Sequence, residues 1–167
     1  IFVVTALYVV IIGILPTFGI ERTSVYPFKK EVQVLLFTFL SFGVLGLYDD
    51  LRKTFGFKRA KFWGLRIRYK FLVQLLLALA IASMLYFDLG IDFVNVSFFD
   101  ILRLNIFYIP FAVFTIISFA NAVNISDGLD GLASGLLLIC LVAFLIISGA
   151  ILDTTLSTFL GLWIGAL

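Results

Sequence analysis

The sequence predicts an all-α fold, a polytopic bundle of membrane-spanning helices. Hydrophobic residues make up 63% of the chain and charged residues only 13%, whereas an ordinary soluble domain is about half apolar and a quarter charged. The apolar residues also form repeated runs of roughly 20, the length that a helix needs to cross a hydrocarbon core of about 30 Å. A soluble helical protein would need polar faces on its outer helices, and the run at 71–87 offers almost none.

Charged or polar residues bound each apolar run, which gives the predicted spans in order. The first run precedes Glu21, the second lies between Glu31 and Asp49, and the third ends at Asp88. The fourth run leads into a polar cluster, and the fifth and sixth are separated by a short polar connection. Run length therefore predicts six spans, at residues 1–20, 32–48, 70–87, 105–122, 133–151 and 155–167.

The two ends of the sequence and its cysteine content bear on the domain organisation and on the kinds of site available. Because the sequence opens at Ile1 and stops at Leu167 inside apolar runs, we expect a single integral membrane domain, 1–167, truncated at both ends. Cys140 is the only cysteine, so a disulfide framework and a thiolate zinc site are excluded within this sequence. Its place in an apolar run indicates a packing residue.

The positive charges predict the orientation of the spans. Cytoplasmic loops carry an excess of Lys and Arg, and eight of the twelve basic residues lie in the second connection, Asp49 to Tyr69, or just after it. They are Arg52, Lys53, Lys58, Arg59, Lys61, Arg66, Arg68 and Lys70. Alternation then places the second and fourth connections in the cytoplasm. A nucleic-acid partner is not indicated, since the net charge is only +2.

A first polar cluster ends the second span, in the sequence FGVLGLYDDLRK. Asp49 and Asp50 are adjacent there, with Gly43 and Gly46 before them. Two carboxylates at a membrane boundary are costly unless they face water, a cation or a bound metal. A solvated pair at the end of a span is an equally good reading of this cluster alone.

A second polar cluster fills the fourth connection, predicted on the same side. Asn121 and Asn124, with Asp127 and Asp130, crowd against an apolar run together with Ser126 and two glycines. Asn124, Asp127 and Asp130 are spaced by three, so on a helical turn they would stand on neighbouring positions of one face. A simpler alternative makes Asp127 or Asp130 the N-cap of the fifth span, although a cap requires only one such residue.

These groups together predict phosphoryl transfer. Carboxylates with oxygen-rich neighbours suit Mg²⁺, which binds through one or two carboxylates plus substrate phosphates. Basic residues on the same side suit a phosphate-bearing partner, although membrane orientation alone also explains them. In phosphoryl transfer the metal and the cations offset the charge of the transferring group while the protein positions the reactants.

Three stretches resemble a known family. NAVNISDGLDGLASG at 121–135, GLYDDLRK at 46–53 and GLRIRYKFLVQ at 64–74 are similar to the signatures of the phospho-N-acetylmuramoyl-pentapeptide transferases. These belong to the polyprenyl-phosphate N-acetylhexosamine-1-phosphate transferases. The resemblance runs along the whole chain in the same order, and it implies an inner-membrane enzyme with ten spans and a site on the cytoplasmic face.

The resemblance also implies a reaction and the roles of residues. The family moves phospho-MurNAc-pentapeptide from UDP-MurNAc-pentapeptide to undecaprenyl phosphate, using Mg²⁺ and releasing UMP, to form the first lipid-linked intermediate of peptidoglycan. Asp49 and Asp50 match its paired acidic residues, implicated in catalysis and in metal binding. The residues matched to substrate binding are Asn121, Asn124, Asp127, Asp130, Lys53, Arg68 and Lys70. The partners implied are the two substrates and membrane lipid, with a homodimer compatible. The family's third essential aspartate would lie beyond Leu167.

Two other functions stay open from the sequence. The same chemistry with UDP-N-acetylglucosamine as donor occurs in relatives of this family. A transporter or channel could also use acidic residues within the membrane, but no ionisable residue lies at the middle of any predicted span.

Overall fold

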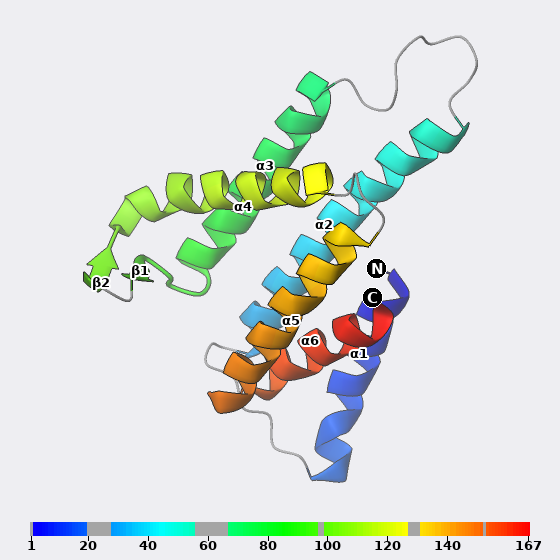
Figure 1. Ribbon diagram of the computed structural model, residues 1–167. Helices are drawn as coiled ribbons and strands as arrows, with labels where there is room; N and C mark the ends of the chain where they lie inside the picture. Colours follow the sequence, from blue (N-terminus) through cyan, green and yellow to red (C-terminus); the bar gives the residue numbers. More distant parts are fainter. Residues whose placement is uncertain (1, 20–27, 56–66, 97–98, 127–130, 152) are drawn as a thin grey trace. The chain divides into compact units, whose positions relative to one another are not determined.

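The structure is a computed structural model, and it describes the chain apart from residues 1, 20–27, 56–66, 97–98, 127–130 and 152 (Figure 1). Helices make up most of the described chain, as predicted. Their bounds are α1 Phe2–Ile14, α2 Phe28–Phe55, α3 Ile67–Phe87, α4 Tyr108–Ser126, α5 Leu132–Ala150 and α6 Thr154–Ala166. A short 3₁₀ turn, η1 Leu15–Phe18, follows α1.

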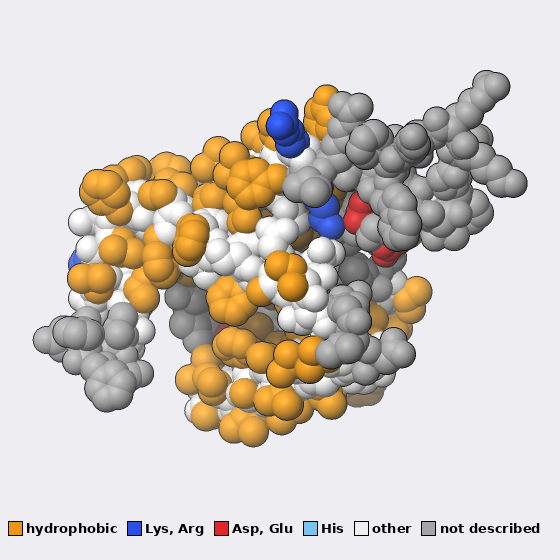
Figure 2. All heavy atoms as spheres, turned by 45° about the horizontal axis from the view of Figure 1, so that its top comes forward, with side chains coloured by type: hydrophobic (Ala, Val, Ile, Leu, Met, Phe, Trp, Pro, Cys, Tyr) orange, Lys and Arg blue, Asp and Glu red, His pale blue; other side chains and the backbone are white. Residues whose placement is uncertain are grey.

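Among the residues that the structure describes, four helices are long and apolar enough to cross a membrane. The candidate spans are Lys30–Leu51, Arg68–Phe87, Asn105–Ser126 and Leu132–Ala150. Apolar side chains cover much of the described surface that Figure 2 presents, as lipid-facing helices require. Thr155–Ala166 is a shorter apolar helix, and α1 has 13 residues. The prediction of an all-α membrane fold is confirmed, with four of the six spans at full length.

The chain forms two compact units. One comprises Val34–Phe119, and the other comprises Ile1–Gln33 with Ala120–Leu167. We call them the central unit and the terminal unit. The prediction of one integral membrane domain over 1–167 stays a prediction.

The core of the central unit lies between α3 and α4. Its buried residues are Ala78, Ala82, Tyr108, Ala112 and Val113. Three of these five are alanines, and their small side chains let two helices come close at the contact. Close packing matters in a membrane because the hydrophobic effect does not drive helices together there. Pro110 is tolerated because it stands in the first turn of α4, where its missing N–H has no intrahelical partner.

A β-hairpin joins α3 to α4, in a connection for which the sequence predicted only a loop. Strand β1, Phe93–Val96, pairs antiparallel with β2, Phe99–Arg103, and a 3₁₀ turn, η2 Asn105–Phe107, leads into α4. Phe93 stands opposite Arg103, and Val94 opposite Leu102. The period-2 pattern is too short here to have been recognised beside the long apolar runs.

The terminal unit packs α6 against both α5 and α1. Asp153 is the N-cap of α6, and its carboxylate accepts a hydrogen bond of 2.9 Å from the Leu156 backbone N–H. By contrast, the N-cap of α5 is Gly131, in a left-handed conformation and without a side-chain cap. The alternative that made Asp127 or Asp130 this N-cap is therefore wrong. Cys140, expected to pack inside, is exposed on α5.

Candidate functional site

The paired carboxylates stand on α2 itself and not in the connection after it. The predicted span ended at residue 48, but α2 continues to Phe55. Residues 47–55 include neither Gly nor Pro, and the Leu, Arg and Lys among them are good helix formers. The helix therefore extends past its apolar run and carries Asp49 and Asp50 on its regular backbone.

Asp49 is buried and ion-paired. Its Oδ2 lies 3.2 Å from Nζ of Lys70, which donates a hydrogen bond to it. The side chains of Asp49 and Lys70 are 8% and 22% exposed. Lys70 stands in the first turn of α3, which begins at Ile67. The structure thus brings together one residue from each of two predicted motifs, 21 positions apart in the chain.

The ion pair offsets the cost of burying the Asp49 carboxylate. A carboxylate withdrawn from water is strongly disfavoured unless a cation and hydrogen bonds compensate it. The Lys70 ammonium supplies that compensation for Asp49. Removing either partner would take away this charge pairing from the other, so the pair is expected to help fix the position of the α3 start against α2.

Asp50 differs from its neighbour because its side chain is exposed. Successive residues on an α-helix are about 100° apart, so the two carboxylates point in different directions. An exposed carboxylate with room for water and substrate phosphates is the kind of ligand that Mg²⁺ uses. The residues therefore fit a magnesium ion held through Asp50, whereas Asp49 already faces an ammonium group. Within the described ranges, no three His, Cys, Asp or Glu residues gather as a preformed metal cage.

The remaining basic candidates flank this pair. Arg68 lies in the first turn of α3, two residues before Lys70, and is exposed. Lys53 lies on α2 one turn after Asp49, and its side chain lies outside the described residues.

The second cluster is described only in part. Asn121 and Asn124 lie in the last turns of α4, half-buried and exposed respectively. Their spacing of three places them on neighbouring positions of one helical face. The common face expected for Asn124, Asp127 and Asp130 stays a prediction. Asp127 and Asp130 lie outside the described residues. Because Asn121 and Asn124 belong to the terminal unit, the sharing of one site by the two clusters stays a prediction.

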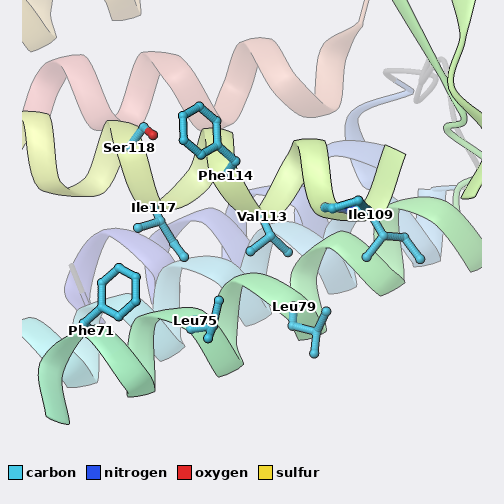
Figure 3. Close-up of a pocket in the computed structure, with 9 residues that line it drawn as sticks. Phe71, Leu75, Leu79, Ile109, Val113, Phe114, Ile117 and Ser118 are labelled. Carbon is cyan, nitrogen blue, oxygen red and sulfur yellow. The ribbon is translucent and has the colours of Figure 1, made fainter. Parts of the chain in front are cut away.

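An apolar groove of about 500 Å³ runs between α3 and α4 in the central unit. Figure 3 shows its lining side chains, which are almost entirely hydrocarbon. They are Phe71, Leu75, Leu79, Ile109, Pro110, Val113, Phe114, Ile117 and Ser118. Phe71, which lines the groove on α3, directly follows Lys70 in the chain.

The sequence reading assigned no role to Gln74, which is only 5% exposed within a candidate span. It stands four residues after Lys70, and Ala78 and Ala82 continue the same buried stripe at intervals of four. Side chains at such intervals share one helical face. In the sequence, the signal for this buried polar residue was a single amide inside an apolar run.

Comparison with known proteins gives the family of the chain. Residues 32–167 match glycosyl transferase family 4. The chain belongs to this family. The match includes the ion pair and the groove, as well as both asparagines of the second cluster.

Individual members of glycosyl transferase family 4 resemble the chain closely. A phospho-N-acetylmuramoyl-pentapeptide-transferase of Caldanaerobacter subterraneus subsp. tengcongensis is 41% identical over 133 residues, covering 80% of this chain and 41% of the relative. The enzymes of that name from Thermodesulfovibrio yellowstonii and Aquifex aeolicus are each 43% identical, over 108 and 111 residues. These matches cover 62% and 64% of this chain and 29% of each relative. The chain therefore spans well under half the length of these relatives.

Proposed function

We propose that the protein transfers phospho-MurNAc-pentapeptide from its UDP carrier to undecaprenyl phosphate, forming the lipid-linked intermediate of peptidoglycan synthesis and releasing UMP. The observation that carries the proposal is that α3 bears both the Asp49–Lys70 pair and, from the next residue on, the lining of an apolar groove. A polyprenyl phosphate needs such a combination, since its head group is anionic and its tail is hydrocarbon. The names of the relatives support the choice of donor and acceptor.

In the proposed reaction an oxygen of the lipid phosphate attacks the phosphorus attached to the sugar. The bond to the UMP phosphate breaks, and its electrons leave with UMP. A phosphomonoester has a second pKa near 6, so the lipid phosphate is already largely dianionic at neutral pH and needs little help from a base. The larger barrier is the approach of an anion to an anion.

Charged residues of the central unit would reduce the repulsion between the two anions. Arg68 and Lys70 present cationic groups at the start of α3, where an anionic head group would lie. Lys70 keeps its orientation through Asp49. Asp50 would hold Mg²⁺, which when bound offsets charge on the pyrophosphate and on the departing UMP. Preorganised charges of this kind usually provide the largest share of catalysis.

The second cluster would bind the nucleotide-sugar donor. Asn121 and Asn124 offer amides that can donate and accept hydrogen bonds to uracil, ribose or sugar hydroxyls, and Asp127 and Asp130 would complete this surface. The motif resemblance supports these roles, as it does for Lys53.

The proposed location is the bacterial inner membrane, with the Asp50 end in the cytoplasm. The concentration of basic residues between Arg52 and Lys70 supports this orientation. It would leave the prenyl tail in lipid while the head group meets a soluble nucleotide. The homodimer compatible with the resemblance stays a prediction, which the mass of the detergent-solubilised complex would test.

The decisive experiment measures UMP release by the full-length protein in detergent. Undecaprenyl phosphate is supplied with either UDP-MurNAc-pentapeptide or UDP-N-acetylglucosamine, with Mg²⁺ or with a chelator. We expect release only with the first donor and only with the metal. Release with UDP-N-acetylglucosamine alone would establish the other donor class, and metal-independent release would remove the proposed role of Asp50.

A further inference from the structure

The hairpin end of the central unit carries an apolar surface that the proposed reaction does not use. Its exposed members are Ile101 and Leu102 on β2, and Ile106 and Phe107 on η2, between 54% and 72% exposed. We call these four residues the hairpin patch. Arg103, also exposed, lies between its two halves in the chain.

The hairpin is tied closely to the spans on either side. The Leu104 backbone N–H donates to the Asp92 carbonyl at 2.8 Å, and the Ile91 N–H donates to the Leu85 carbonyl at 3.1 Å. Ile91 and Leu104 also pack against the core between α3 and α4. The base of the hairpin is therefore fixed to the end of α3 and to the start of α4.

The patch continues the lipid-facing surface of α4. Phe107, Phe111 and Phe114 are spaced by four and three, so they follow one helical face, and they are 72%, 45% and 72% exposed. The candidate membrane span Asn105–Ser126 contains all three, and it also contains Ile106. The exposed apolar face of α4 therefore continues through Phe107 into the hairpin patch.

We infer that the hairpin patch inserts into the interfacial layer of the bilayer, with Arg103 directed to lipid phosphates. Apolar and aromatic side chains are favoured at the boundary between acyl chains and head groups, and an Arg beside them can reach the phosphate layer with its guanidinium while its stem stays in apolar surroundings. The partner is a phospholipid surface and not a second protein.

Site-directed fluorescence in vesicles tests this inference. The full-length protein, with its native cysteines replaced, receives Ile101→Cys or, separately, Ile106→Cys, and each is labelled with a small fluorophore. A variant that keeps only Cys140, which is exposed on α5, serves as the lipid-facing reference. The vesicles contain phosphatidylethanolamine and phosphatidylglycerol, with nitroxide-bearing acyl chains as the lipid quencher and iodide as the aqueous quencher.

We expect the nitroxide lipids to reduce fluorescence at positions 101 and 106 by about as large a fraction as at Cys140, and iodide to reduce it little. Strong quenching by iodide without quenching by the lipids would mean that the patch faces water. Protection from both quenchers would mean that protein covers it. Either result would overturn the inference. The two positions are read separately, so misfolding of one labelled variant, detected by thermal unfolding, leaves the other to decide.

Discussion

The two ends of α3 hold their neighbours in different ways. At its first turn, Lys70 reaches across to Asp49 on α2, and the connection between the helices depends on two opposite charges withdrawn from water. At its last turn, the hydrogen bonds to the base of the hairpin are between backbone groups, such as that from the Ile91 N–H to the Leu85 carbonyl at 3.1 Å. The first end therefore depends on the identity of particular side chains, and the second on backbone conformation.

The largest expected effect is on the rate of UMP release, and it should differ between an acidic residue near the first end of α3 and one near its last end. Asp50→Asn in the full-length protein should reduce UMP release about a hundredfold or more, because it removes a charge placed to hold the metal. Stability should change by less than about 0.5 kcal/mol, since the side chain is exposed. The matched change at the hairpin end, Asp92→Asn, should leave the rate unaltered. Equal rates for the two variants would show that Asp50 does not hold a metal needed for the reaction.

A double-mutant cycle would measure the ion pair. Asp49→Asn and Lys70→Met should each destabilise the protein by about 2 kcal/mol, less than the roughly 3–5 kcal/mol of a fully buried pair because Lys70 keeps some contact with solvent. The double variant should lose less than the sum of the two, since it leaves no unpaired charge. Thermal or denaturant unfolding in detergent gives the values. Strict additivity would show that the two charges do not depend on each other.

The groove predicts a smaller effect on substrate binding. Leu75→Trp should fill part of the groove and raise the KM for undecaprenyl phosphate about tenfold, as expected if roughly two methylene groups of the tail lose their contacts. The KM for the UDP donor should stay the same. Leu76→Trp is the matched control, because Leu76 is exposed on α3 and does not line the groove. Equal effects at both positions would indicate a general disturbance of α3.

The smallest expected effect concerns the backbone at the hairpin end. Gly90 has φ +69°, a left-handed conformation in which a side chain costs about 1 kcal/mol. Gly90→Ala should therefore destabilise the protein by about that amount. Gly46→Ala, on α2 with no atom within 4 Å of the added carbon, should be neutral or slightly stabilising. Unfolding in detergent compares the two, and equal changes would contradict the proposed dependence on conformation.

The helices could be predicted from the sequence because the length and composition of each apolar run are local properties. Run length and composition identify the helices of a membrane protein without knowledge of their partners, and the candidate spans at 68–87 and 132–150 agree with prediction within a few residues. The end of α2 was missed because solvated residues that favour helix can extend a span beyond its apolar part. The hairpin was missed because its strands are only four and five residues long.

The candidate site shows the limit of motif reading. Asp49 and Asp50 were treated as one pair, because adjacent letters carry no information about direction. The structure separates them into a buried partner of Lys70 and an exposed carboxylate. That separation depends on helical rotation and on the packing of a distant segment, neither of which is visible in a short motif. The groove likewise requires side chains from α3 and α4 together.

The ion pair also has a consequence for how the chain tolerates insertions. Asp49 and Lys70 join two points that are 21 positions apart, and the entropy of closing a flexible segment grows only with the logarithm of its length. Doubling the intervening length costs about 0.6 kcal/mol, less than the pair is expected to contribute. A longer chain between these two positions should therefore leave the ion pair in place, so the pair depends on its two charges more than on the length of the connection.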